Sequence, residues 1–104
     1  MTAQLKSHTQ GETLVLTLSN PDYRNALGPQ IYSAGIEALN AAESNSDIRS
    51  VVITGEGGNF CSGGDVHEII GPLTQMTMPE LMNFTRMTGD LITAMRACPQ
   101  PIVA

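Results

Sequence analysis

Residues 51–66 read VVITGEGGNFCSGGDV, a short apolar run followed by a glycine-rich loop. The run Val51–Thr54 is rich in β-branched residues and is bounded by polar residues and glycine. Such a run is typical of a strand that is buried on both faces of a parallel sheet. Five of the chain's 10 glycines lie between positions 55 and 64, so the chain is expected to turn sharply after this strand.

The glycines alone leave two interpretations of the loop open. On the first, Gly63 and Gly64 only make a tight turn, and Asp65 caps the element that follows. On the second, the glycine N–H groups lie exposed at the start of a helical turn, where they can hold an anion or polarise a carbonyl oxygen. Dinucleotide and P-loop sites are disfavoured, because no G-x-G-x-x-G opens a helix here and no Gly-Lys-Ser/Thr follows.

Regular elements are predicted on the N-terminal side of this loop. Residues 13–18 alternate leucine with threonine and valine, which predicts a strand that ends at Pro21. A helix is predicted from Pro29 to about residue 44, because small and apolar residues recur there at helical spacing. The remaining N-terminal stretch, residues 1–10, is interpreted as a polar tail in which His8 is exposed.

A second helix is predicted on the C-terminal side of the loop. Thr77 and Glu80 have the spacing of a capping box, and the helix is expected to end before Pro99. Its predicted buried stripe includes methionines, which more often fill gaps in a core than form an adaptable ligand surface. The stripe comprises Leu81, Phe84, Met87, Leu91 and Met95, with Met82 also assigned to the helix. Residues 102–104 are predicted to open another buried strand.

The composition excludes several classes of protein. The 104 residues, 41% of them hydrophobic, fit a single globular domain. Five Lys and Arg against 10 Asp and Glu leave no basic stripe for a nucleic-acid backbone. No apolar run approaches the roughly 20 residues of a membrane span, and residues 1–10 lack the apolar core of a secretory signal. We therefore expect a cytoplasmic protein without nucleic-acid or membrane partners, in which Cys61 and Cys98 are unpaired thiols.

Three segments, taken in order, resemble the enoyl-CoA hydratase/isomerase family, or crotonase superfamily. Asn20-Pro21 through Tyr23-Arg24-Asn25-Ala26-Leu27 is similar to the family's N-P-x-x-x-N-A-L turn. Phe60 through Val66 is similar to its F-x-x-G-x-D-[IVL] motif, and Pro99–Ala104 to its K-P-x-I-A-A strand, with Gln100 where Lys is common. The resemblance implies an α/β fold with a crotonase-like (ClpP/crotonase) ββα-repeat core.

The resemblance also implies site residues. The backbone N–H of Gly64 would be one of two donors to the oxygen of an acyl-CoA thioester. The permanent charge of Arg24 suits a CoA phosphate. All the implied CoA contacts are Arg24, Ala26 and Leu27 in the turn and Ser62, Gly64, Asp65, Val66 and His67 in the loop. No metal or prosthetic group is expected, because CoA enters as part of the substrate. For His67, an ordinary surface position is favoured over a ligand contact.

Hydration of a 2-enoyl-CoA is the leading reaction that the family implies. Isomerisation, other crotonase reactions, a noncatalytic CoA-binding module and a small phosphate-binding domain with an accidental resemblance stay open as alternatives. The family's second oxyanion donor and its acid/base carboxylates lie beyond the strand matched by residues 102–104, and Glu56, Glu68 and Glu80 do not match them. Residues 1–104 are therefore interpreted as the incomplete N-terminal part of a crotonase-like domain, inactive alone. The full-length enzyme is expected to be a homo-oligomer, a trimer or hexamer.

Overall fold

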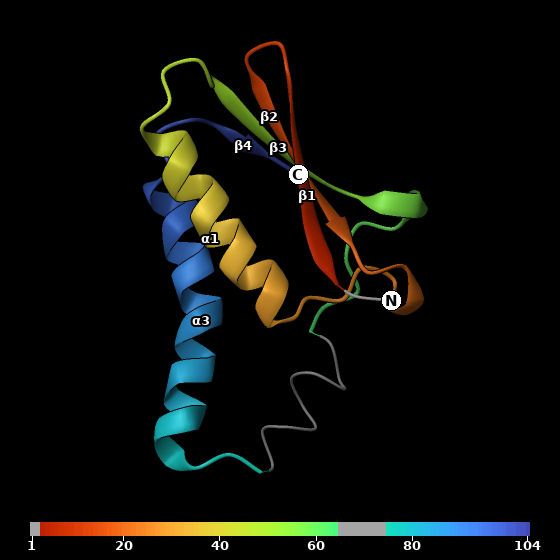
Figure 1. Cartoon of the computed structure of the whole chain (residues 1–104), viewed down its shortest axis with the longest axis vertical. Helices are drawn as coiled ribbons and strands as arrows, with labels where there is room; N and C mark the ends of the chain where they lie inside the picture. Colours follow the sequence, from red (N-terminus) through yellow and green to blue (C-terminus); the bar gives the residue numbers. More distant parts are fainter. Residues whose placement is uncertain (1–2, 65–74) are drawn as a thin grey trace.

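The computed structural model describes residues 3–64 and 75–104 (Figure 1). In these ranges a four-stranded sheet has the order β1-β2-β3-β4, and two α-helices lie against it. The strands are β1 (Gln4–Gln10), β2 (Thr13–Ser19), β3 (Ser50–Gly55) and β4 (Ile102–Val103), and the helices are α1 (Pro29–Glu43) and α3 (Met78–Ala97). Short 3-10 turns, η1 (Pro21–Tyr23) and η2 (Glu56–Gly58), follow β2 and β3.

The first strand corrects the interpretation of residues 1–10 as a polar tail. Residues 4–10 form β1, which pairs antiparallel with β2 from Gln10 opposite Thr13 to Gln4 opposite Ser19. The hairpin turns at Gly11, whose φ of 63° lies in the left-handed region that glycine adopts without strain. Every side chain of β1 except Leu5 is exposed, His8 among them, so the strand carries no alternating apolar pattern that could have revealed it.

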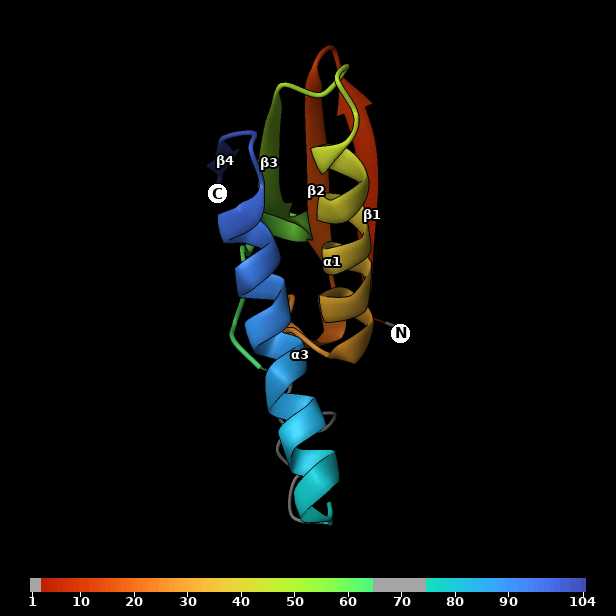
Figure 2. The ribbon, with the colours of Figure 1, turned by 90° about the vertical axis from the view of Figure 1, so that its left-hand side faces the viewer.

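The two central strands confirm the predicted parallel pair. β2 and β3 run parallel, with Leu14 opposite Val51 and Leu16 opposite Ile53. The leucines of β2 point into a core in which Leu16 is 2% and Val51 0% exposed. The predicted burial of β3 on both faces is wrong for the described residues, because Thr54 is exposed and Val52 only half-buried. Both described helices pack on the same face of the sheet (Figures 1 and 2).

The helices begin where the capping signals indicate. Pro29 is the first residue of α1, and Thr77 caps α3 in a capping box with Glu80, whose Oε1 accepts from the Thr77 N–H at 3.0 Å. The stripe predicted as buried on α3 is only half-buried, and Met82 is 49% exposed. The reason is visible in Figure 2: the N-terminal half of α3 extends past the sheet, and only its C-terminal half, with Met95, packs on the core.

The last strand, β4, pairs parallel with β3 through Ile102 opposite Val51, so a strand is present as predicted at 102–104. Its predicted burial is wrong for the described residues, because Val103 is 59% exposed. Cys61 and Cys98 are free thiols, each half-buried. In the described part of the chain, neither helix is long and apolar enough to cross a membrane. The fold thus places the carboxyl ends of β2 and β3 side by side, and the two motif-bearing loops leave the sheet from these ends (Figure 1).

Candidate functional site at the ends of β2 and β3

The turn that follows β2 is a compact, self-bonded loop. The Asn20 carbonyl accepts from the N–H groups of Tyr23 at 3.0 Å and of Asn25 at 2.9 Å. Arg24 and Asn25 have φ values of 53° and 61°, a left-handed pair that reverses the chain before α1. Asparagine tolerates this region better than most residues, which accounts locally for its place in the turn. Arg24 is thereby held at the surface and Asn25 in the interior, where it is 1% exposed.

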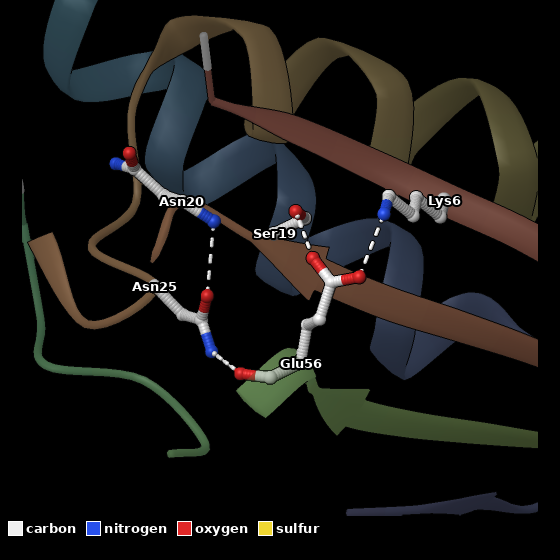
Figure 3. Close-up of polar contacts among 5 residues, drawn as sticks. All are labelled: Lys6, Ser19, Asn20, Asn25 and Glu56. Atoms are coloured by element: carbon white, nitrogen blue, oxygen red, sulfur yellow. Dashed lines mark hydrogen bonds and ion pairs between the residues drawn. The ribbon is translucent and has the colours of Figure 1, made fainter. Parts of the chain in front are cut away.

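The side chain of Asn25 fastens this turn to the loop that follows β3. Its Oδ1 accepts from the Asn20 N–H at 2.9 Å. Its Nδ2 donates to the carbonyl of Glu56 at 3.0 Å and to that of Asn59 at 2.8 Å. Figure 3 shows the amide between Asn20 and Glu56, with its two ends turned toward different segments of the chain. Both donors and the acceptor of this buried amide are therefore used.

The same two segments meet again where the motif glycines lie. The Leu27 N–H donates to the Gly63 carbonyl at 2.7 Å, and Leu27 forms a parallel bridge with Gly64. The Ser62 hydroxyl donates to the Tyr23 carbonyl at 2.8 Å. Leu27, Ser62 and Gly64, which the sequence assigned to one binding site from positions far apart, are thus brought together.

Gly64 is exposed, and its N–H donates to no acceptor among residues 3–64 and 75–104. The preceding Gly63 has a φ of 100°, a conformation that a side chain would strain, so the sharp turn expected of the glycine pair is present. An exposed N–H at a turn of this kind can donate to a carbonyl oxygen or an anion. The assignment of Gly64 as an oxyanion donor agrees with this geometry and stays a prediction.

The predicted CoA contacts in the turn differ in what they can offer a ligand. Arg24 is exposed and pairs with no carboxylate in the described ranges. Ala26 is 4% exposed, its N–H donates to Tyr23 and its carbonyl accepts from Asn20 Nδ2 at 3.1 Å. A carbonyl has a second lone pair, so the Ala26 oxygen can accept a further hydrogen bond from a ligand. Asp65, Val66 and His67 lie outside the described residues, as does Glu68.

The carboxylate of Glu56 is bound by side chains of β1 and β2. Its Oε1 lies 2.7 Å from Lys6 Nζ, and its Oε2 accepts from the hydroxyl of Ser19 (Figure 3). The bond from Lys6 and then that from Ser19 lower the pKa of Glu56 from its ordinary value of 4.5. The pKa of Glu80 is lowered as well, by its bonds to the Thr77 backbone and hydroxyl in the capping box. Both glutamates are therefore anions with structural partners, which does not suit a general acid.

Sequence reasoning missed the network around Asn25 and Glu56. Asn25 belongs to the segment that resembles the N-P-x-x-x-N-A-L turn, but its burial and its bonds to Glu56 and Asn59 cannot be read from the sequence. Lys6 was missed together with its strand, and nothing in the sequence around Ser19 marks its bond to Glu56, 37 residues away.

An apolar cavity of about 510 Å³ opens between the sheet and the two helices. Most of its wall is aliphatic and comes from β1, β2, α1 and α3. Leu27, Phe60 and Cys61, from the two motif-bearing segments, complete one part of the wall. Among the residues described, no group of three or more His, Cys, Asp or Glu side chains is arranged to hold a metal ion. The site is thus an exposed N–H donor and an exposed arginine on segments that border an apolar space.

Known proteins with similar sequences point to one family. The enoyl-CoA hydratase/isomerase family model matches residues 8–104. The chain is 37% identical over 57 residues to an enoyl-CoA hydratase of Mycobacterium tuberculosis, which covers 55% of this chain and 21% of that protein. It is 28% identical over 102 residues to the mitochondrial Delta(3,5)-Delta(2,4)-dienoyl-CoA isomerase of Mus musculus, which covers 91% of this chain and 31% of that protein. The chain thus spans less than a third of the length of these two relatives.

Solved structures agree with the sequence comparison. An enoyl-CoA hydratase from Polaromonas sp. JS666 superposes with a TM-score of 0.88 at 48% identity, over 95% of this chain and 38% of that one. An enoyl-CoA hydratase/isomerase from Marinobacter aquaeolei superposes with a TM-score of 0.84 at 30% identity, over 95% of this chain and 39% of that one. The predicted crotonase-like α/β fold is confirmed by these neighbours. With nearly its whole length matched by the family model and by these folds, the chain belongs to the enoyl-CoA hydratase/isomerase, or crotonase, family.

Proposed function

We propose that the protein that carries this chain adds water to the double bond of a 2-enoyl-CoA thioester, with the N–H of Gly64 as a donor to the thioester oxygen. The observation that carries the proposal is the 2.7 Å hydrogen bond from the Leu27 N–H to the Gly63 carbonyl. This bond joins the turn that presents Arg24 to the loop that presents Gly64. One extended ligand with a phosphate at one end and a carbonyl at the other fits such a pair of segments.

The chemistry requires a donor of this kind. When water adds to the conjugated bond, its oxygen bonds to the β-carbon, and negative charge moves to the thioester oxygen until the α-carbon takes a proton. A preorganised N–H stabilises that charge most in the transition state, and loss of one such donor typically costs about 3–4 kcal/mol. The remaining steps need an acid and a base, which the family supplies from residues that match none in this chain.

The other contacts follow from the character of the groups. Arg24, exposed and unpaired among the described residues, would bind a phosphate of CoA through its guanidinium fork. The apolar cavity beside Leu27 and Phe60 would take the acyl chain, since burial of each CH₂ group is worth about 0.8 kcal/mol. CoA acts here as part of the substrate, and no prosthetic group is proposed.

Isomerisation of an unsaturated acyl-CoA is the second candidate. The observation that favours it is that relatives named dienoyl-CoA isomerase match 91% and 96% of this chain. An isomerase also develops charge on the thioester oxygen, so the donor role of Gly64 is common to both reactions.

The two reactions are separated by assaying the complete protein that carries this sequence with crotonyl-CoA and with a 3-enoyl-CoA. Hydration removes the conjugated absorbance of crotonyl-CoA, whereas isomerisation creates such absorbance from the 3-enoyl thioester. Turnover of the first substrate supports the proposal, and turnover of only the second supports the isomerase. Failure of both, by a protein that also binds no CoA, would reject the function.

We propose that the 104 residues alone are inactive, because none of them matches the family's acid/base carboxylates, and Glu56 and Glu80 are engaged structurally. Turnover by the purified 104-residue chain, free of host hydratase, would contradict this. The complete protein is proposed to act in the cytoplasm as a homo-oligomer, for which sedimentation of the purified protein is the test.

A further inference from the structure

The amide of Asn25 uses both of its donors and its acceptor within the described structure. It is 1% exposed and makes three hydrogen bonds of 2.8–3.0 Å, to the Asn20 N–H and to the carbonyls of Glu56 and Asn59. Its removal would take away the hydrogen bonds that Asn25 donates to two backbone carbonyls and the bond that it accepts from the Asn20 N–H. Because a buried polar group without a partner is destabilised, the surrounding segments would have to move to reach water or each other.

These three bonds connect segments with different tasks. Asn25 follows Arg24 directly and lies two residues before Leu27, in the turn proposed to hold CoA. Glu56 and Asn59 begin the loop that leads to Gly64. One side chain therefore joins the turn of the proposed phosphate contact to the loop of the proposed oxyanion donor, in addition to the Leu27–Gly63 and Ser62–Tyr23 bonds.

The loop side of this connection is itself fastened to the sheet. The carboxylate of Glu56, whose carbonyl accepts from Asn25, is bound by Lys6 on β1 and by Ser19 at the end of β2 (Figure 3). Figure 3 shows Glu56 between the two strands and the turn, with its carboxylate and its carbonyl directed to opposite sides. The Asn25 amide is thus held against a fixed point of the fold, as a residue that orients a functional segment must be.

We propose that Asn25 is a positioning residue for the reaction: its amide keeps the Arg24 turn and the Gly64 loop in register, so that both engage the same CoA thioester. This inference rests on the proposed function. It goes beyond it by assigning a role to a residue that touches neither CoA nor the reacting atoms. A displacement of about 1 Å in such an arrangement can lower the rate about a hundredfold.

Asn25→Gly in the complete protein is the sharpest test. Glycine adopts the φ of 61° without strain, so this variant removes the amide and leaves the backbone shape accessible. We expect kcat/KM to fall about a hundredfold, with kcat lowered and the dissociation constant of CoA raised together. Asn25→Asp should behave alike, because it keeps the acceptor for Asn20 and turns a carboxylate oxygen toward two carbonyls.

Asn45→Gly is the matched control. The Oδ1 of Asn45 accepts from the Asp47 N–H at 3.0 Å in an exposed turn after α1, away from both motif segments. The same chemical change there should leave kcat and CoA affinity as in the wild type. Ser62→Ala, which removes one exposed bond between the turn and the loop, should lower kcat and CoA affinity in the same direction as Asn25→Gly, by a smaller factor.

A residue that only stabilises the fold would lower the melting temperature and leave the folded enzyme's kcat and CoA affinity unchanged. That result for Asn25→Gly would overturn the positioning role. If Asn25→Gly does not fold, unchanged constants for Ser62→Ala would overturn it instead. A wild-type protein that converts no enoyl-CoA would reject the proposed function. An active wild type whose Asn25→Gly variant is equally active would reject only the positioning role.

Discussion

The N–H of Leu27 and the carbonyl of Gly63 are 2.7 Å apart, and this bond joins two segments that 35 residues of helix, strand and loop separate in the sequence. Its geometry follows from the parallel pairing of β2 with β3, which brings the carboxyl ends of both strands to the same edge of the sheet. In open α/β sheets, ligands bind beyond such ends. The proposed CoA site lies where that rule places it.

Arg24→Ala should weaken CoA binding through lost phosphate contact. We expect the dissociation constant of CoA to rise about tenfold or more, on the scale of a hydrogen bond to a charged group. A pantetheine analogue without phosphates should be affected much less. Arg49→Ala is the control, since Arg49 lies at the opposite end of β3, 3.6 Å from Glu12. Isothermal titration calorimetry measures both ligands, and equal losses for CoA and the analogue would reject a phosphate role.

Gly55→Ala should destabilise the fold. A Cβ there would collide with the Asn59 carbonyl and lie 2.7 Å from the Cα of Phe60, and both obstacles are backbone. Overpacking of this kind typically costs about 1–3 kcal/mol. The same substitution at Gly89, in α3 with nothing within 4 Å of the new Cβ, should instead stabilise by about 0.5–1 kcal/mol. Urea denaturation compares the two, and a neutral Gly55→Ala would contradict the close approach.

Glu56 should make the stability of the fold depend on pH in the acidic range. Its pKa is lowered by Lys6 and Ser19, so the folded state binds the proton less readily than the unfolded chain does. The stabilisation is therefore fully present above its ordinary pKa of 4.5 and is lost as the pH falls through the lowered folded value. Melting temperatures of wild type and Glu56→Gln should differ at neutral pH and converge in acid. Melting temperatures of the two proteins that run parallel across this pH range would show that ionisation of the Glu56 carboxylate does not stabilise the fold.

Lys6→Met supplies the second arm of that experiment. The hydrogen bond from Lys6 is the largest cause of the lowered pKa of Glu56. Lys6→Met should therefore remove much of the pH dependence of the melting temperature that Glu56 causes. The Lys6→Met/Glu56→Gln double variant should then lose less free energy of unfolding than the two single variants lose in sum. Strict additivity would mean that Lys6 and Glu56 do not interact in solution.

The parts of the fold that were predicted from the sequence are those with strong local signals. Leucine alternation identified β2, and Pro29 and the Thr77–Glu80 box marked the starts of both helices. β1 was missed because Leu5 is its single apolar side chain and because its strand conformation comes from pairing with β2. Burial on α3 was overestimated, since helical periodicity shows which face is apolar and not whether anything covers it.

The candidate site was predicted unevenly for a similar reason. Arg24, Leu27, Ser62 and Gly64 were assigned to the site through a resemblance between motifs; the described structure brings their segments together, and their contacts with a ligand stay a prediction. Asn25, Glu56, Lys6 and Ser19 were not found, because their roles arise from hydrogen bonds between positions 31 to 50 residues apart. No local pattern encodes such partners.

The most direct measurement is kcat/KM of the Gly64→Pro variant of the complete protein, with Gly64→Ala beside it. Alanine keeps the N–H and should be tolerated, whereas proline removes it and should lower kcat/KM about a hundredfold or more. Circular dichroism and CoA affinity establish that the proline variant is folded and still binds. A folded Gly64→Pro enzyme with the kcat/KM of wild type would contradict the assignment of Gly64 as the donor to the thioester oxygen.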